Sequence, residues 1–135
     1  MIGVLERRQK IWVDAFNNIP DWQEKYAYLI ELGENDTKCH ESIKTPANRL
    51  KSCLSASYFF VEIKKGILYV DGTSNGNIPA GIIALVKAIF NEISVEDLRQ
   101  ADIFFHIDSG LCDNLTGNRR YSIIEMISRI KNISG

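Results

Sequence analysis

The spacing of apolar residues predicts two helices at the start of the chain. Four apolar side chains near the N-terminus would share one helical face: Leu5, Trp12, Ala15 and Phe16. This pattern stops at Asn17-Asn18-Ile19-Pro20, and Asp21-Trp22-Gln23-Glu24 then has the form of a capping box. We therefore expect a second helix that ends at Gly33 as its C-cap. The inner face of that helix would consist of Trp22, Tyr26, Leu29 and Ile30.

The middle of the chain changes to a period of two, which predicts a β-hairpin. Residues 34–46 are polar and end at Pro46, so we expect a surface loop there. From about Leu50 the residues alternate, with Phe59, Val61 and Ile63 on one face and Tyr58, Phe60 and Glu62 on the other. Lys64-Lys65-Gly66 is a candidate turn into a returning strand over residues 67–70. Residues 71–77 (DGTSNGN) have loop composition.

Helical spacing returns in the second half of the chain. One helix would bury Ile82, Leu85, Val86, Ile89, Phe90 and Ile93. Asn77 is its candidate N-cap, with Pro79 in the first turn. A short helix is expected from Ser94 to Arg99, with Asp97 at the capping-box position relative to Ser94. A final helix is expected from about Arg119 to Asn132. The final helix would bury Ile123, Met126, Ile127 and Ile130.

These elements together predict an α+β fold, in which a small antiparallel β-sheet is packed on one face by several α-helices. The chain has no repeats and no long linker, so residues 1–135 are expected to form a single domain.

The charge and hydropathy of the chain exclude several function classes. Sixteen basic residues oppose seventeen acidic ones, which gives no bulk attraction to nucleic acid or to an anionic membrane. No apolar run approaches the roughly 18 residues of a membrane span. The N-terminal residues MIGVLERRQK, with Glu6, do not resemble a signal peptide, so we expect a cytoplasmic protein.

Three cysteines are present, namely Cys39, Cys53 and Cys112, and their odd number and spacing argue against a disulfide framework. Cys53 lies in LKSCLSASY, among a lysine and three serines, immediately before the apolar strand. This context indicates a thiol placed to be reached from solvent, and Lys51 would modestly favour its thiolate. The alternative is a half-buried cysteine at a strand end.

Arg119 and Arg120 open the last predicted helix, where positive charge opposes the helix dipole. With the free N–H groups of the helix start, a guanidinium there could form an anion pocket. The alternative is a solvated pair of arginines.

Two further chemistries are possible from the residue types. Cys39, His40, Cys53, His106 and Cys112 could ligate zinc or an iron–sulfur cluster, although none of their spacings is diagnostic. A Cys53–His106 hydrolase pair would need a proximity that spacing does not encode. No glycine-rich phosphate-binding loop is present.

Four segments in order resemble the SufE family of sulfur-acceptor proteins. Residues 21–33 (DWQEKYAYLIELG) are similar to the family's W-E-x-x-Y-x-x-I-I-x-L-G helix, and residues 48–59 (NRLKSCLSASYF) to its N-x-I-x-G-C-x-S-x-V-W segment. Residues 71–86 (DGTSNGNIPAGIIALV) resemble its G-D-S-D loop and following helix, and residues 115–127 (LTGNRRYSIIEMI) its L-S-x-S-R-x-x-G-L-x-x-M helix. The chain departs from the family pattern at the cysteine and the facing loop, at Ser52, Leu54, Tyr58, Thr73, Asn75 and Ser122.

The resemblance implies a fold like that of SufE and IscU proteins and a role in iron–sulfur cluster assembly. Cys53 would take persulfide sulfur from a SufS-like cysteine desulfurase, stimulate it, and pass the sulfur to a SufBCD-like scaffold complex. Arg119 matches the family's arginine and would stabilise the anionic sulfur or position a loop. Other residues expected at the partner-facing loops are Lys51, Ser52, Ser55, Thr73, Ser74 and Asn75.

The resemblance also implies what the chain would not do alone. It would be an accessory protein, not a stand-alone enzyme, and a monomer or weak homodimer without its own cofactor or metal. Pyridoxal phosphate would belong to the partner desulfurase. Two alternatives remain open: a metal or iron–sulfur cluster scaffold of similar fold, and a non-catalytic regulator that binds the desulfurase.

Overall fold

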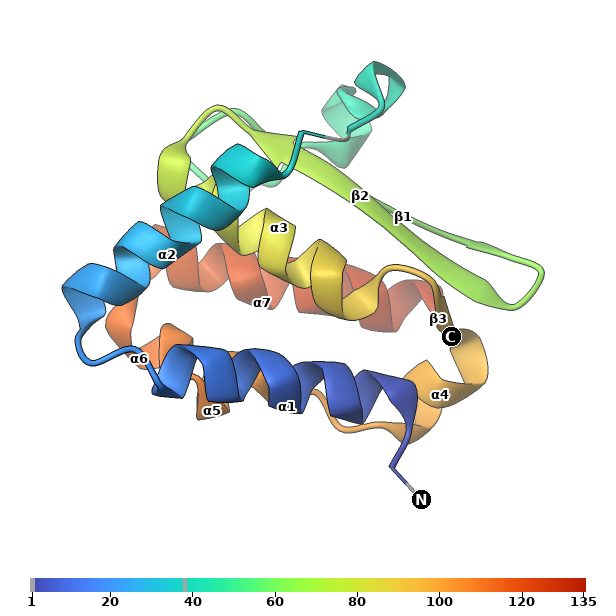
Figure 1. The fold of residues 1–135 in the computed structure, drawn as a ribbon. Helices are drawn as coiled ribbons and strands as arrows, with labels where there is room; N and C mark the ends of the chain where they lie inside the picture. Colours follow the sequence, from blue (N-terminus) through green and yellow to red (C-terminus); the bar gives the residue numbers. More distant parts are fainter. Residues whose placement is uncertain (1, 38) are drawn as a thin grey trace.

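A three-stranded antiparallel sheet in the order β1-β2-β3 forms one layer of the protein. β1 (Ser57–Lys64) pairs along its whole length with β2 (Ile67–Ser74), and β3 (Ile93–Ser94) pairs with the start of β2. The computed structural model describes residues 2–37 and 39–135. In it α2, α3 and α7 lie on the same side of the hairpin, with α1 beyond them (Figure 1). The predicted α+β fold is therefore confirmed.

The helical layer consists of long helices joined by short ones. Their bounds are α1 (Val4–Asn17), α2 (Trp22–Asn35), α3 (Asn77–Phe90), α4 (Val95–Gln100), α5 (Phe105–Asp108), α6 (Leu111–Asn114) and α7 (Gly117–Ile133). Two 3-10 turns, η1 (Glu41–Ile43) and η2 (Pro46–Asn48), precede the hairpin. Among residues 2–37 and 39–135, no helix combines the length and the apolarity that crossing a membrane requires.

α3 lies at the centre of the hydrophobic core, between the sheet and the outer helices (Figure 1). Six of its apolar side chains are at most 1% exposed: Ile82, Ile83, Leu85, Val86, Ile89 and Phe90. α7 contributes Ile123, Met126, Ile127 and Ile130 to the same core, as its spacing predicted. The core on this side of the sheet is thus stabilised by the burial of large apolar side chains, which is the main favourable term in folding.

Two glycines let α2 and α3 approach each other closely. A Cβ atom on Gly81 would lie 1.9 Å from the carbonyl oxygen of Leu29, and one on Gly33 would lie 2.7 Å from the backbone nitrogen of Gly81. The prediction that Gly33 ends the second helix is wrong, because α2 continues to Asn35. Gly33 is needed for interhelical contact and not for a left-handed cap.

Helix starts were predicted better than element lengths. Asp21 accepts a hydrogen bond from the backbone N–H of Glu24 at 2.8 Å, and Ser94 accepts one from Asp97 at 3.1 Å, so both caps are confirmed. Asn77 is the first helical residue of α3 and not its cap, which is Gly76. β2 extends to Ser74, so most of the predicted loop at residues 71–77 is strand.

A buried glutamine joins α1 to the segment before α5. Gln9 is fully buried, and its side-chain oxygen accepts hydrogen bonds from the backbone N–H groups of Phe104 (2.7 Å) and Phe105 (3.1 Å). Its amide nitrogen donates to the carbonyl oxygen of Asp102 at 2.9 Å. A buried polar side chain is tolerated when its hydrogen bonds are made, and here they order an irregular backbone segment.

Replacement of Gly81 by alanine tests the close packing of α2 on α3. We expect Gly81→Ala to lower the free energy of unfolding by about 1–3 kcal/mol or more, because the new methyl group overlaps the Leu29 carbonyl. Gly117→Ala is the matched control, since its Cβ would meet only Tyr121, at 3.9 Å. That control should be neutral or stabilising by up to about 1 kcal/mol. Equal midpoints for the two variants in urea unfolding would contradict this account of the contact.

Candidate functional site

Cys53 is carried by a short loop whose two ends are anchored next to each other. We call residues 50–56 the cysteine loop. Its base is closed by the backbone N–H of Leu50, which donates to the carbonyl oxygen of Ser57 at 2.9 Å, and by a β-bridge between Arg49 and Tyr58. The Leu50 side chain is 1% exposed and anchors this base in the core. The loop is therefore an excursion from the sheet that begins and returns at one place.

The thiol of Cys53 is turned inward. Its residue is only 9% exposed, and Sγ lies 3.1 Å from Oγ of Ser57, which lies 2.7 Å from Oγ of Ser74. Leu54, the next residue, is 85% exposed. The thiol that was expected to be reachable from solvent is therefore covered in this conformation, because the loop folds back against the core.

A small apolar cavity adjoins the thiol. It has a volume of about 10 Å³ and is lined by Leu50, Cys53, Pro79, Ile82, Ile83, Arg119, Ser122 and Met126. This is roughly the space that one water-sized atom occupies. Arg119, in the first turn of α7, is the one residue with a formal charge among those lining residues. The predicted pair of Cys53 and Arg119 therefore shares one cavity.

The cysteine loop also contacts the segment that follows β2. The backbone N–H of Ala56 donates to Oδ1 of Asn75 at 3.0 Å, and the N–H of Asn75 donates to the carbonyl oxygen of Ala56 at 3.1 Å. Gly76 is so close to Ser55 that a Cβ atom there would lie 2.4 Å from the Ser55 hydroxyl. The structure thus brings Ser55 and Ala56, at the end of the cysteine loop, against Asn75 and Gly76.

Ser74 and Thr73 differ in their relation to the thiol. Ser74 lies opposite Ser57 in the hairpin and joins the hydroxyl pair beside Cys53. Thr73 lies opposite Tyr58, one position along the strand, and successive strand side chains point to opposite faces. Thr73 is therefore placed away from the thiol, whereas Ser74 is placed beside it.

Sequence reasoning missed the group that attaches the cysteine loop to α7. The Glu125 carboxylate accepts hydrogen bonds from the backbone N–H of Lys51 at 3.1 Å, the N–H of Ser52 at 3.0 Å and the Ser52 hydroxyl at 2.6 Å. Two of the predicted loop residues, Lys51 and Ser52, are thus held by a partner 74 and 73 residues away. The only sequence signal was a Glu–Arg pair spaced for one helix face, which is common on helices.

Arg129 completes this arrangement one helical turn further along α7. Its guanidinium bonds the Glu125 carboxylate at 2.6 Å and the carbonyl oxygen of Arg49 at 2.7 Å. Longer contacts reach the carbonyl oxygens of Asn48 (3.3 Å) and Phe59 (3.4 Å). Arg129 therefore binds the base of the cysteine loop. It also orients the Glu125 carboxylate, which binds Lys51 and Ser52 in the part of the loop beyond its base (residues 51–56, here called the loop tip).

The electrostatics favour the ionised form of Glu125. Burial raises the pKa of this carboxyl, but the hydrogen bonds from Ser52 and Lys51 and the charge of Arg129 outweigh burial and hold the pKa below its ordinary value. The carboxylate is thus stabilised as an acceptor by the same loop that it holds.

The other two thiols lie elsewhere, and each ionises less readily than an unperturbed cysteine. Burial, with a contribution from Asp71, raises the pKa of Cys39, which lines a groove between α3 and the hairpin. Burial also raises the pKa of Cys112, on α6. Since the thiolate is the reactive form, neither environment activates these cysteines as nucleophiles.

The metal and hydrolase alternatives find no supporting geometry in the described part of the chain. Among residues 2–37 and 39–135, no three His, Cys, Asp or Glu side chains are grouped so that they could hold a metal ion. His106 is on α5, outside the set of described residues that line the cavity beside Cys53. Burial, and then Lys131, lowers the pKa of His106.

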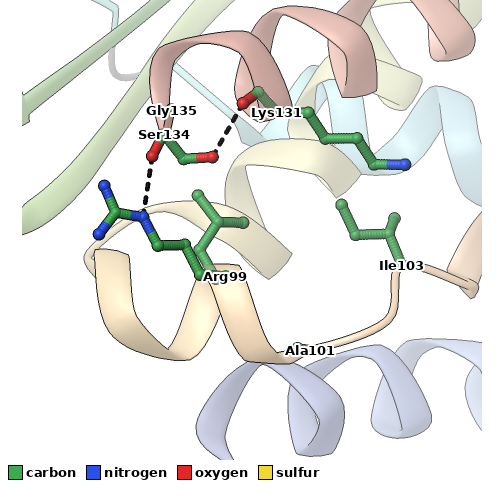
Figure 2. Close-up of a pocket in the computed structure, with 7 residues that line it drawn as sticks. Arg99, Ala101, Ile103, Lys131, Ser134 and Gly135 are labelled. Carbon is green, nitrogen blue, oxygen red and sulfur yellow. Dashed lines mark hydrogen bonds between the residues drawn. The ribbon is translucent and has the colours of Figure 1, made fainter.

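A second cleft lies at the other end of α7 (Figure 2). It has a volume of about 330 Å³ and is lined by Leu98, Arg99, Ala101, Ile103, Lys131, Ser134 and Gly135. Nε of Arg99 donates to the carbonyl oxygen of Ser134 at 2.9 Å. Because Arg119 and Lys131 are separated by about 18 Å along the helix axis, this cleft is distinct from the Cys53 cavity.

The chain is similar to known proteins over nearly its whole length. Residues 10–134 match the family model described as "SufE: Fe-S metabolism associated domain". An uncharacterized SufE-like protein of Rhizobium meliloti (strain 1021) is 30% identical over 126 residues, which cover 88% of this chain and 89% of that protein. Another uncharacterized SufE-like protein, from Rhizobium etli, is 27% identical over 124 residues, which cover 88% of this chain and 84% of that protein. The resemblance drawn from the sequence motifs is thereby confirmed.

A solved structure shares the fold. The solution structure of a hypothetical protein from Thermus thermophilus superposes with a TM-score of 0.70, covering 98% of each chain. The two sequences are 13% identical, so this likeness supports the architecture alone.

The dependence of stability on pH tests the Glu125 contacts. Because the folded protein holds the pKa of Glu125 below its ordinary value of 4.5, the ionised carboxylate stabilises the fold above that pH. This contribution is lost as the pH falls through the lower pKa of the folded state. We therefore expect the difference in unfolding free energy between the wild type and Glu125→Gln to be larger at about pH 7 than at about pH 3.

Glu6→Gln is the matched control for that comparison, because it breaks an exposed i,i+4 pair with Lys10 on α1, far from the cysteine loop in sequence. Urea unfolding of the three proteins at both pH values measures the effect. An identical Glu125→Gln difference at both pH values would contradict the assigned contacts.

Proposed function

The chain belongs to the SufE family of Fe-S metabolism associated domains, and from this membership we propose that Cys53 accepts sulfur as a persulfide and carries it to iron–sulfur cluster assembly. The family has its role in iron–sulfur metabolism and implies a cysteine desulfurase as partner. The sulfur donor in this proposal is a SufS-like desulfurase, and the next acceptor is a SufBCD-like scaffold complex. The chain acts as an accessory carrier in the cytoplasm.

The observation that carries the proposal is the environment of the Cys53 sulfur. The thiol lies on a short loop that is closed at its base, beside an apolar cavity with room for about one atom. A persulfide differs from a thiol by one sulfur atom, which would occupy the space next to Sγ. Apolar walls formed by Ile82, Ile83 and Met126 would keep water and reductants from it.

The transfer step is a displacement at sulfur, as in thiol–disulfide exchange. The Cys53 thiolate attacks the terminal sulfur of a persulfide on the donor cysteine. A new S–S bond forms at Cys53, the S–S bond of the donor breaks, and the donor cysteine leaves as a thiolate. The transferred sulfur atom keeps its oxidation state, so the exchange needs no added oxidant or reductant.

Arg119 is assigned to the anionic sulfur in this step. Its residue lines the same cavity as Cys53, in the first turn of α7, where the helix dipole also favours negative charge. A persulfide terminus is anionic when deprotonated, and a guanidinium beside it forms a charge-assisted contact. The positive charge therefore favours the loaded form of the protein.

Attack on a donor in another protein requires the loop to open. At 9% exposure the Cys53 residue offers no in-line approach for a second polypeptide. Displacement at sulfur needs that approach, so the conformation described above corresponds to the sheltered state between transfers. A loop hinged at Leu50 and Ser57 can supply the reach.

The cluster-scaffold alternative has less support. It requires Cys53 to share a metal with other thiols, whereas no metal-holding group of three ligands occurs among the described residues. We therefore keep the persulfide carrier as the proposed function.

Intact-mass measurement without reductant tests the proposal. After incubation with a cognate cysteine desulfurase and free cysteine, we expect the protein to gain one sulfur atom. The gain should vanish in Cys53→Ser and persist in Cys39→Ser and Cys112→Ser. Sulfur distributed equally over the three cysteines would refute a dedicated carrier, and full desulfurase stimulation by Cys53→Ser would favour a regulator instead.

Removal of the Arg119 charge tests its assigned role. Arg119→Met should slow sulfur uptake by about tenfold, which is the loss expected for one charge-assisted contact of roughly 1.4 kcal/mol. Arg119→Lys should lose less, because it keeps the charge. Arg120→Met is the neighbouring control, since Arg120 is exposed and outside the cavity lining. Equal rates for Arg119→Met and Arg120→Met in time-resolved mass measurements would remove Arg119 from the mechanism.

A further inference from the structure

We propose that Glu125, oriented by Arg129, is a latch that keeps the cysteine loop closed and sets how often Cys53 becomes accessible. The latch itself follows from contacts of the loop with α7. Its consequence for sulfur transfer rests on the proposed function, because the cargo that it shelters would be the Cys53 persulfide. Glu125 is in this view a positioning residue for the transfer reaction.

The tip of the cysteine loop has little apolar surface to hold it down. Leu54 is 85% exposed and Lys51 is exposed, while Ser52, Ser55 and Ala56 are half-buried and small. Within residues 51–56, Cys53 supplies the one buried side chain. Hydrophobic burial therefore contributes little to closure, and the polar contacts decide whether the tip stays in place.

Those polar contacts come from two sides and differ in strength. On the β2 side, Asn75 exchanges two neutral hydrogen bonds with Ala56. On the α7 side, the charged Glu125 carboxylate accepts three hydrogen bonds from Lys51 and Ser52. Hydrogen bonds to an ionised acceptor are roughly twice as strong as neutral ones. Glu125 thus makes the larger contribution to closure of the loop. Two of its three hydrogen bonds come from Ser52, the residue that precedes Cys53.

Arg129 makes the latch reversible. When the loop tip leaves, the carboxylate keeps its 2.6 Å contact with Arg129 and is not left as an unpaired charge. The same guanidinium holds the carbonyl oxygen of Arg49, outside the tip, at 2.7 Å. The base of the loop therefore stays fixed while the tip opens, and the released carboxylate stays in position to bind it again.

Alkylation of the three cysteines measures the opening of the loop directly and does not depend on sulfur transfer. Wild type and Glu125→Gln are treated with N-ethylmaleimide at one pH, and labelling at each cysteine is followed by peptide mass spectrometry. We expect Cys53 to be labelled at least about tenfold faster in Glu125→Gln, equivalent to about 1.4 kcal/mol of lost closure. Cys39 and Cys112 are internal controls, and their rates should change by less than about twofold.

Two further variants sharpen the comparison. Glu6→Gln removes an i,i+4 ion pair on α1 and should leave all three labelling rates unchanged. Ser52→Ala removes only the hydroxyl donor and retains both backbone donors to Glu125. It should accelerate Cys53 labelling by about threefold, less than Glu125→Gln does. Acceleration of all three cysteines together, or of none, would overturn the latch.

Loss of the persulfide to cyanide links the latch to the proposed function. Protein loaded by desulfurase and cysteine is separated and exposed to cyanide, which takes the terminal sulfur as thiocyanate and leaves the Cys53 thiolate. Thiocyanate should appear about tenfold faster from Glu125→Gln than from wild type, in parallel with the alkylation rates. Equal rates of thiocyanate release from loaded proteins would overturn sheltering by the latch. A wild type that gains no sulfur would refute the proposed function, while the alkylation rates would still decide whether the latch exists.

Discussion

The hydrogen bonds between the Glu125 carboxylate and the cysteine loop connect the sheet to α7, and the position of Cys53 depends on them. The cavity beside the thiol has walls from α3 and α7, but its remaining side is the loop itself. Without Glu125 the loop tip would retain neutral contacts alone, namely those of Ala56 with Asn75 and of the Cys53 thiol with the Ser57 hydroxyl. A charged acceptor can hold a polar loop that offers little apolar surface, because the loop's backbone N–H groups and hydroxyl can all donate to it.

The frame around this loop has a different physical origin. α3 is buried on nearly all sides, and it approaches α2 closely because Gly33 and Gly81 carry no side chain. Gln9 orders the irregular segment before α5 through three hydrogen bonds. Large apolar side chains thus form the packed core, while a few polar contacts hold the cysteine loop against it. This contrast lets one segment open while the core stays intact.

Features that depend on neighbouring residues were predictable. The caps at Asp21 and Ser94, the Lys64-Lys65-Gly66 turn and the buried face of α7 each rest on residues within a few positions of one another. Gly33 was misassigned because a glycine near a helix end has two explanations, a cap or a close contact, and local spacing does not distinguish them. Cys53 was singled out from its polar context and from the family motif around it, but local context does not show that its thiol is covered in this conformation.

The sequence by itself determined the order and type of the main elements and the family. It also singled out Cys53 as the candidate functional residue. The tertiary structure decided that Cys53 points inward, that Arg119 shares its cavity, and that Glu125 binds a loop 73 residues earlier. Gln9 meets its partners across more than 90 positions for the same reason. Such contacts depend on how the helices stack against the sheet, and the periodicity of a segment encodes which face it buries but not which residue it meets there.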